Sequence, residues 1–325
     1  MPTASYFGRN AFIQLKEEGT WGTAQAGSDL QRPLISCSML RQVEKVERPN
    51  LNVSGTAGLR KGHFIVSDKS TGSLSIEATY DNLNPILYQA LGTGATTSPS
   101  TNNTHTFTMA DVPASGLTMS LQRGTGQVEV FEGTVINTLT LKCAAGEAMT
   151  LDADVIAQTS AARTTAITFT QPTNENLILH NHLTAAGLDW DSQNISLIDF
   201  EFSLENGLAE RMRLGDLTTK QPTMADYRNA QVTVSFETDD ATYAKLLADT
   251  TGDAVIIFDN GGAGSAQRTL TFTIHNAYIS EYADEISETG LVVATVTLKG
   301  EGDGTDHGVS IAAYNVAANS YSDSA

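Results

Sequence analysis

Basic residues are scarce in this 325-residue chain, and their scarcity limits the partners it can bind. Lysine and arginine number 19 against 37 aspartate and glutamate residues, which gives a formal net charge of −18. Tight, non-specific binding of nucleic acid is not expected, because phosphates are neutralised by Lys and Arg. An acidic surface repels phosphate over about 8 Å at physiological salt. A role in which the protein must avoid adhering to DNA therefore stays open.

Cysteines and long apolar runs are also few. Cys37 and Cys143 form no CxxC pair and have no histidine at zinc-ligand spacing, so we expect reduced, partly buried thiols rather than a disulfide. The N-terminal segment 1–19 lacks the apolar run of a signal peptide. No uninterrupted apolar stretch approaches the ~20 residues that span a membrane. We expect a protein made and folded in a cytoplasm, with no membrane partner.

Charged residues make up only 17% of the chain and aromatic residues 7%, and Thr, Ala, Ser and Gly fill the difference. This composition suits short strands joined by many turns. Apolar and polar residues alternate with a period of two through most of the chain, and the alternating runs end in Gly, Asn, Asp or Pro. Clear examples are residues 128–143, 148–157, 195–207 and 268–282. The pattern predicts a mainly β fold.

Only two segments have helical spacing, and each follows a strand. Residues 83–91 follow the strand at 72–80 and stop at Gly92, and residues 241–248 follow the strand at 230–238. A long polar excursion precedes each strand–helix element, at 44–70 and 205–229, and a β-hairpin region follows each. A loop rich in Ser, Thr and Asn is expected at 93–104.

This repeated order predicts a duplicated unit. We expect two tandem β-sandwich or barrel domains, each with one short flanking α-helix and a long loop or hairpin excursion. The boundary is expected within 158–175, which gives domains 1–165 and 166–325. Each short helix is expected to cover the end or face of its barrel.

Motifs for chemistry are weak. His180 and His182 fall on one face of a possible strand, a spacing that some metal sites use, but no acidic or cysteine cluster accompanies them. The acidic turns at 189–194 and 301–308 do not meet the EF-hand pattern, and the segment 123–127 lacks the Lys-Ser/Thr pair of a phosphate loop. No nucleophile motif is present. We expect no catalytic, cofactor-binding or metal-binding residues.

Charge is distributed unevenly along the chain. Residues 41–70 hold six basic and three acidic side chains, whereas residues 281–306 hold seven acidic side chains and one lysine. One interpretation is that the basic excursion of one subunit docks on the acidic segment of the next. A solvated hairpin and a solvated tail are the alternative. The candidate inter-subunit contacts are Arg48, Arg60, Lys61, Glu285 and Glu288.

The segment FIQLKEEGTWGTA (12–24) resembles the opening of the tail tube proteins of long-tailed bacteriophages. In that family an apolar strand leads into a motif close to E-[ST]-x-[YFW]-G-T, and here Gly19 stands where Ser or Thr is usual. A glycine before a strand (Gly72), a helix ending in Leu91–Gly92 and a hairpin glycine (Gly146) follow in the family's order. The resemblance covers the first 160 residues, and the second half through the repeat.

The resemblance implies a structural virion protein whose β-sheets join laterally into rings around a hollow lumen, with long loops linking one ring to the next. A duplicated chain would form the ring from three subunits with pseudo-sixfold symmetry. Implied partners are other copies of the chain, the tape measure protein, the tail terminator and the distal tail proteins, with DNA passing through without tight binding. Assembly would take place in the bacterial host's cytoplasm.

Two other function classes remain open on the residues alone. A two-domain adhesin or carbohydrate-binding protein would need an aromatic platform, for which Trp21 and Trp190 are the tryptophans at hand. A glycosidase would need two carboxylates ~5–10 Å apart in a cleft.

Overall fold

The computed structural model describes residues 11–48, 62–81, 83–98, 102–110, 115–124, 127–163, 176–191, 193–248, 251–285, 292–302 and 308–316. The first half contains β1 (Phe12–Glu17), β2 (Leu30–Pro33), β3 (Ser36–Cys37), β4 (Leu40–Glu47), β5 (His63–Glu77), α1 (Asn84–Leu91), β6 (Gly92–Thr97), β7 (Asn103–Met109), β8 (Leu117–Arg123), β9 (Gln127–Ala144), β10 (Thr150–Ala157) and β11 (Thr159–Arg163).

The second half contains β12 (Leu183–Trp190), β13 (Gln193–Ile195), β14 (Leu197–Glu205), β15 (Leu208–Arg211), β16 (Lys220–Met224), β17 (Asn229–Glu237), α2 (Asp240–Ala248), β18 (Gly252–Asp259), β19 (Thr269–Glu285), β20 (Val293–Lys299) and β21 (Val309–Asn315). Single 3₁₀ turns occupy His180–His182 and Gly264–Ala266. The predicted fold class is confirmed: the chain is mainly β, with large antiparallel sheets and short helices at both predicted positions. No helix among these residues is long and apolar enough to cross a membrane.

Three sheets make up the body, and two long strands each belong to two of them. The long sheet has the order β3/β4–β5–β10–β9–β14–β17–β20–β19. The first cover sheet has the order β2–β1–β8–β9–β11. The second cover sheet has the order β6–β7–β21–β19–β18–β12–β13.

Each shared strand changes sheet near a residue with positive φ. In β9 this residue is Gly133 (φ 62°), at the irregularity just before Thr134, the last residue paired with β8; pairing with β10 begins at Val135. In β19 it is Asn276 (φ 48°), just before Ala277, the last residue paired with β18; pairing with β20 begins at Tyr278. Glycine and asparagine are the residues that tolerate this conformation best. The two long strands therefore bend in the same way, once in each half.

The strand pairing of the first half recurs in the second. The chain of pairs β2–β1–β8–β9–β10–β5 has the same connectivity as β13–β12–β18–β19–β20–β17, and β11 lies on β9 as β21 lies on β19. Each helix follows the equivalent strand, β5 or β17. The order of elements predicted from the sequence thus corresponds to a repeated topology. The boundary predicted between residues 165 and 166 lies outside the described residues, so the domain limits stay a prediction.

The apolar sides of the cover sheets and of the long sheet share one core. Ile13 and Leu121 of the first cover sheet, Leu139 of the long sheet and Phe272 of the second cover sheet belong to a single cluster of buried side chains. In the second half, the Phe272 ring packs on Phe200 and Phe258 at centroid distances of 4.9 and 6.4 Å. Burial at about 25 cal/mol per Å² of apolar surface makes this packing the main stabilising term.

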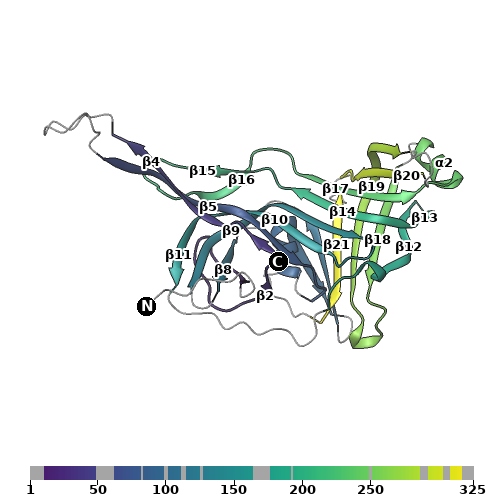
Figure 1. Cartoon of the computed structure of the whole chain (residues 1–325), viewed down its shortest axis with the longest axis horizontal. Coiled ribbons are helices and arrows are strands. Elements are labelled where there is room, and N and C mark those ends of the chain that lie inside the picture. The colour runs from purple at the N-terminus through teal and green to yellow at the C-terminus, as the bar shows by residue number, and fades with distance from the viewer. Residues whose placement is uncertain are drawn as a thin grey trace.

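The halves are joined directly. Strands β9 and β14 pair over seven residues, from Thr138–Glu205 to Ala144–Asp199. Arg268 forms a 2.8 Å ion pair with Asp81, across the two halves. The pairing of β9 with β14 joins the strands of the two halves into one continuous sheet. This sheet crosses the molecule in Figure 1.

One sequence expectation about this region was wrong. The expected loop 93–104 contains β6 and the start of β7, which form a hairpin. The outer strand of that hairpin, β7, pairs with β21 of the second half from Asn103–Asn315 to Thr108–Ser310. Residues 92–97 read GTGATT and lack alternating large apolar side chains. Segment 92–97 forms a strand because it pairs with β7, and the local sequence pattern does not reveal that partner.

Helix α1 is enclosed more completely than expected. All eight of its residues are buried. Gly92, at φ 110°, ends the helix and donates its backbone N–H to the Tyr88 carbonyl. Asn206 and Arg228, from the second half, donate to the Ala90 carbonyl at 3.0 and 2.6 Å. The second half therefore covers the C-terminus of α1, where helix carbonyls have no partner within the helix.

Candidate assembly surfaces

One face of the long sheet is polar across its width. Side chains alternate along each strand, so Leu151 and Ala153 of β10 lie in the core while Asp152 and Asp154 lie on the opposite face. Outside the β4–β5 hairpin, the charged residues with described side chains on this polar face are eight acidic ones, Glu77, Asp152, Asp154, Asp199, Glu201, Glu205, Glu237 and Glu281, and two basic ones, Lys142 and Lys299. Serine and threonine occupy most of the remaining positions.

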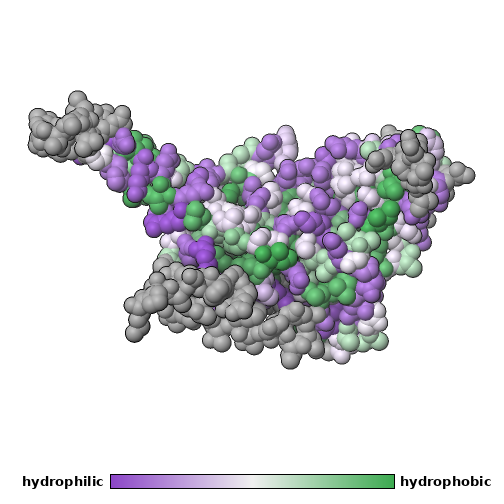
Figure 2. Space-filling model, viewed as in Figure 1, coloured by the Kyte–Doolittle hydropathy of each residue, from purple (hydrophilic) through white to green (hydrophobic). Residues whose placement is uncertain are grey.

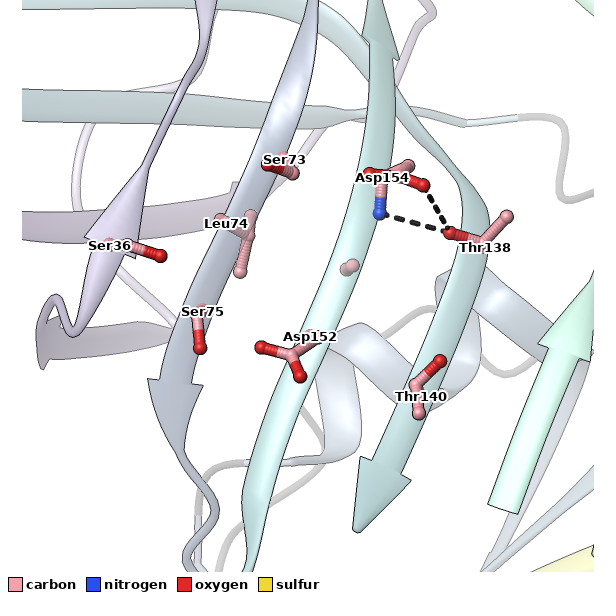
Figure 3. Close-up of a pocket in the computed structure, with 9 residues that line it drawn as sticks. Ser36, Ser73, Leu74, Ser75, Thr138, Thr140, Asp152 and Asp154 are labelled. Atoms are coloured by element: carbon pink, nitrogen blue, oxygen red, sulfur yellow. Dashed lines mark hydrogen bonds between the residues drawn. The ribbon is translucent and has the colours of Figure 1, made fainter. Parts of the chain in front are cut away.

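A shallow groove of about 230 Å³ lies on this face (Figure 3). Ser36, Ser75, Thr140 and Asp152 project into it from neighbouring strands. Every one of these side chains is short and polar. Leu74 and Ala153 also line the groove, but each is only 3% exposed, so the groove offers mainly hydroxyl groups and carboxylates to solvent rather than the apolar lining typical of a small-ligand site.

The groove carboxylates are engaged by neighbours. Thr138 donates to Asp154 at 2.9 Å, and Lys142 forms a 2.7 Å ion pair with Asp152. Burial alone would raise the pKa of Asp152, but hydrogen bonds from Lys142 and Ser75, together with the lysine charge, outweigh it and lower the pKa. A glycosidase acid needs a raised pKa, so Asp152 is shifted in the wrong direction for that role.

A second surface is the arm, defined as the paired strand segments Leu40–Glu47 of β4 and His63–Thr71 of β5. It projects from one end of the molecule, opposite α2 (Figure 1). Arg41 donates from Nε to Asp68 at 2.8 Å across the hairpin. The β15–β16 hairpin packs along its base, where Asp68 N–H donates to the Leu217 carbonyl at 2.7 Å and Lys69 pairs with Glu210 at 2.7 Å. The two polar excursions predicted from the sequence therefore contact each other within one chain.

The arm has exposed apolar side chains on both of its faces. Phe64 is 51% exposed, and Val46, Ile65 and Val66 are also exposed. Apolar patches lie among polar ones along the arm in Figure 2. A two-stranded hairpin that extends from the body buries little by itself, and exposed apolar clusters of this kind mark interaction sites.

Most of the candidate inter-subunit contacts predicted from charge lie at the ends of the described segments or outside the described residues. Arg48 is exposed at the end of β4, and its backbone N–H donates to the Gly62 carbonyl at 2.9 Å. Glu285 is the last residue of β19, where only its backbone is described. Arg60, Lys61 and Glu288 lie outside the described residues. The docking of these basic and acidic segments stays a prediction.

The motif that carried the family resemblance has a structural role in the first cover sheet. Glu18 is 0% exposed at the end of β1. Its carboxylate accepts hydrogen bonds from Gly133 N–H (2.8 Å), Gly22 N–H (2.8 Å) and the Thr118 hydroxyl (3.0 Å). It therefore ties the turn after β1 to β8 and to the bend of β9. The sequence suggested the motif but not the partners Thr118 and Gly133, which lie 100 and 115 residues away.

Trp21 completes this arrangement and explains the glycine at the bend. A Cβ built on Gly133 would lie 2.1 Å from the Trp21 ring. The other tryptophan, Trp190, is 1% exposed in β12. Both side chains are therefore used for packing, and neither forms the flat exposed platform that the carbohydrate-binding alternative needs.

The remaining sequence candidates also have structural environments. His180 and His182 lie in a 3₁₀ turn, so the expectation of a strand there was wrong, and His182 Nδ1 is 3.1 Å from the Tyr80 hydroxyl. Within the described residues, no group of three or more His, Cys, Asp or Glu side chains could hold a metal ion. Cys37 and Cys143 are free thiols, partly buried and buried, as predicted. Of the acidic turns, residues 192 and 303–307 lie outside the described set.

A β-rich fold with exposed apolar side chains on its arm and an acidic polar sheet face has the features of a subunit that assembles with others. A scan against protein-family models matches residues 8–300 to the phage tail tube protein family, and the chain belongs to that family. A search of curated proteins gave no significant match. The protein is a structural component of a phage tail, and the predicted resemblance is confirmed.

The environment of Glu18 gives a testable pH dependence. Burial, together with the nearby negative charge of Glu132, raises the pKa of its carboxyl above the ordinary value of 4.5, although the hydrogen bonds from Gly133, Gly22 and Thr118 act in the opposite direction. Since the folded protein holds this proton more tightly than the unfolded chain does, the resulting stabilisation is complete below pH 4.5 and is lost as the pH rises through the folded-state pKa.

We therefore expect the difference in free energy of unfolding between wild type and Glu18→Gln to be largest at low pH and to shrink above pH 4.5. At neutral pH the variant should remain destabilised by about 1–3 kcal/mol, because the Gln amide group cannot accept the Gly22 hydrogen bond. Denaturant titrations across pH 3.5–8 measure both effects. The neighbouring Glu17→Gln is the control, and an identical pH profile for the two variants would contradict the assignment.

Proposed function

We propose that three copies of the chain close into a ring with pseudo-sixfold symmetry, and that the rings stack into the hollow tail tube through which phage DNA passes. Each half of the chain, 1–165 and 166–325, supplies one of six similar ring positions. The observation that carries this proposal is the long sheet, which is continuous across both halves and has one acidic polar face.

The dimensions of such a ring suit a DNA conduit. The long sheet has eight strand positions, counting β3/β4 as one, then β5, β10, β9, β14, β17, β20 and β19. Three copies would give 24 strands in one barrel. With strands about 4.8 Å apart and tilted by about 40°, this barrel is about 48 Å across at the backbone. That width leaves room for double-stranded DNA after inward side chains are placed.

The polar face of the long sheet is the surface that would line the lumen. Its apolar side is already used by the core, so in a closed barrel the polar side is free to face the channel. Eight carboxylates against two lysines per copy repel phosphate at short range. The short Ser and Thr side chains between them can be hydrated without gripping a passing duplex.

The arm is the part of the chain that would contact the next ring in the stack. It extends from the body and carries apolar side chains that are not covered within the chain. The basic residues Arg48, Arg60 and Lys61 on or near the arm would meet the acidic segment with Glu285 and Glu288 of a neighbouring copy. The tape measure protein, the tail terminator and the distal tail proteins are further proposed partners, with assembly in the host cytoplasm.

Imaging tests the ring directly. Purified protein, alone at high concentration or mixed with a tail initiation complex, should form hollow tubes whose averaged cross-sections have threefold symmetry. Negative-stain and cryogenic electron microscopy provide the measurement. A chain that stays monomeric under both conditions would rule the proposal out.

Removing the apolar surface of the arm should separate ring stacking from folding. In the double variant Phe64→Ser, Ile65→Ser, we expect unchanged thermal stability within about 3 °C, since surface substitutions cost little, but tubes at least several-fold shorter. Val316→Ser, at another exposed apolar residue outside the arm, is the control. Tubes of wild-type length in the arm variant would show that the arm does not link rings.

Reversing the charge of acidic residues on the polar face should make the lumen of the tube bind DNA. In assembled tubes of Asp154→Lys, Glu205→Lys, retained duplex DNA should increase, and the retention should weaken steeply between 50 and 200 mM salt because each phosphate contact releases counterions. Tubes of Glu210→Lys, at a site beside the arm, serve as the control. Equal DNA retention by both variants would argue against this face as the lumen.

A further inference from the structure

Asparagine is followed by glycine at two places in the chain, Asn206–Gly207 and Asn260–Gly261. In this dipeptide the backbone nitrogen of the glycine can attack the side-chain carboxamide of the asparagine, because glycine has no Cβ to hinder the approach. The attack forms a succinimide ring and releases ammonia. Since both sites carry the same pair of residues, a difference in their reactivity must come from the folded structure.

The fold protects the first of these sites. Asn206 is 2% exposed, and its Nδ2 donates hydrogen bonds to the Ala90 and Ile136 carbonyls at 3.0 and 2.9 Å. Its Oδ1 accepts a hydrogen bond from Nε of Arg228 at 2.8 Å. The nitrogen that would have to leave is therefore anchored between helix α1 and strand β9, where little solvent reaches it.

The second site lies in the turn between β18 and β19, next to solvent. Asn260 is half-buried and Gly261 is exposed, with a φ of 68°. The Asn260 side chain folds over the backbone that follows it, because its Oδ1 accepts a hydrogen bond from the Gly262 N–H at 3.0 Å. This arrangement keeps the carboxamide beside the Gly261 nitrogen, which lies between the two bonded residues.

The turn also supplies a base and an oxyanion site. The Gly261 N–H donates to Oδ1 of Asp259 at 2.8 Å, so a carboxylate is placed to accept the proton of the attacking nitrogen. Oδ1 of Asn260 accepts a second hydrogen bond, from the Arg268 N–H at 2.9 Å. The backbone N–H groups of Gly262 and Arg268 are thus in position to stabilise the negative charge that develops on this oxygen during the attack.

We propose that Asn260 is a site of spontaneous, intramolecular deamidation, with Asp259 as the base and the backbone of the turn as the oxyanion site. The Gly261 nitrogen loses its proton to Asp259 and bonds to Cγ of Asn260, and the Cγ–Nδ2 bond breaks. Nδ2 takes up that proton and leaves as ammonia. Water then adds across one of the two ring C–N bonds, which leaves aspartate or isoaspartate at position 260. Water is the only other reactant.

The modification would act on a contact between the two halves. Arg268 is 7% exposed, and its Nε is 2.8 Å from Oδ1 of Asp81 in the first half. Aspartate at position 260 can still accept the hydrogen bonds from Gly262 and Arg268, but it loses the donation from Nδ2 to the Ala266 carbonyl at 2.9 Å. Isoaspartate adds a carbon to the main chain shortly before Arg268. The turn that positions this ion pair would therefore change as the protein ages.

The two Asn-Gly sites allow a test with an internal control. The purified full chain is kept at neutral pH in water enriched in heavy oxygen, then digested in ordinary water, and its peptides are followed by mass spectrometry. Each deamidation that occurs before digestion takes up one heavy oxygen atom. In the folded protein, Asn260 should convert at least several-fold faster than Asn206. In denaturant the difference should largely disappear, because the fold no longer distinguishes the sites.

The variant Asp259→Asn separates the base from the geometry of the turn. The amide oxygen of the new side chain can still accept the Gly261 hydrogen bond, but it is not a base. We expect conversion of Asn260 to slow at least several-fold, with the thermal unfolding midpoint of wild type, and to depend more steeply on pH because hydroxide then replaces the carboxylate. Asp253→Asn, at an exposed carboxylate of the same strand, is the matched control and should leave the rate unchanged.

The outcomes decide both parts of the proposal on the free chain, without any need for rings or tubes. Equal conversion of Asn260 and Asn206 in the folded protein, or Asn260 that stays intact as long as Asn206, would overturn the site. An Asn260 rate in Asp259→Asn equal to that of wild type would overturn the base. If the variant is unstable, wild type alone decides this point: a rate proportional to hydroxide activity overturns the base, and a shallower pH dependence supports it.

Discussion

Every exposed strand edge carries backbone N–H and C=O groups that need partners, and this constraint organises the molecule. An unpaired edge is a template for another strand. The chain satisfies one such edge internally, where β14 joins β9 over seven residue pairs. That joint turns two strand sets into one sheet, and Asn206 and Arg228 of the second half donate to the Ala90 carbonyl at the C-terminus of the buried helix α1. The orientation of the two halves depends on it.

The bent strands β9 and β19 allow one sheet to serve two purposes. Because each changes sheet near Gly133 or Asn276, its first part closes the core and its second part extends the long sheet. Alternation then assigns one side of the long sheet to the core and the other to solvent. The acidic, hydroxyl-rich face is a consequence of the same period-two pattern that makes the protein fold. Fold and surface chemistry are therefore encoded together.

The local sequence pattern predicted those helices and strands that can be recognised without knowing which strands they pair with. The helices at 84–91 and 240–248, the alternating strands β9, β10 and β19, and the turn at Gly146 all follow from spacing and turn residues. The strand β6 was missed because GTGATT carries no apolar alternation and depends on β7 for its pairing. The His180–His182 turn was mistaken for a strand because a two-residue spacing alone does not distinguish the two.

Contacts between residues that are far apart in the sequence could not be predicted from the local sequence pattern. Glu18 could be recognised as part of a motif, but its hydrogen bond from Gly133 spans 115 residues, and the close contact of the Trp21 ring with that glycine is similarly distant in the sequence. The apolar residues of the arm read as ordinary strand residues in the sequence. Only the extension of the hairpin away from the body shows that they are left uncovered. The runs of charged residues also indicated the two polar excursions. They did not reveal that an ion pair between Lys69 and Glu210 joins the excursions within one chain.

The two halves are similar in topology but their joints would not be equal, and the difference has a physical consequence. The internal joint is reinforced by the β6–β7 hairpin, whose second strand pairs with β21 of the other half. The second half has no room for such a hairpin, because only three residues separate α2 from β18. A joint within one chain is also formed at high effective concentration, whereas a joint between copies must overcome the loss of translational freedom on association. The internal joints would thus form during folding, while the joints between copies would remain reversible until stacking through the arm holds several of them at once. A duplicated chain with one strong and one weaker joint can fold as a separate subunit and still complete a closed ring.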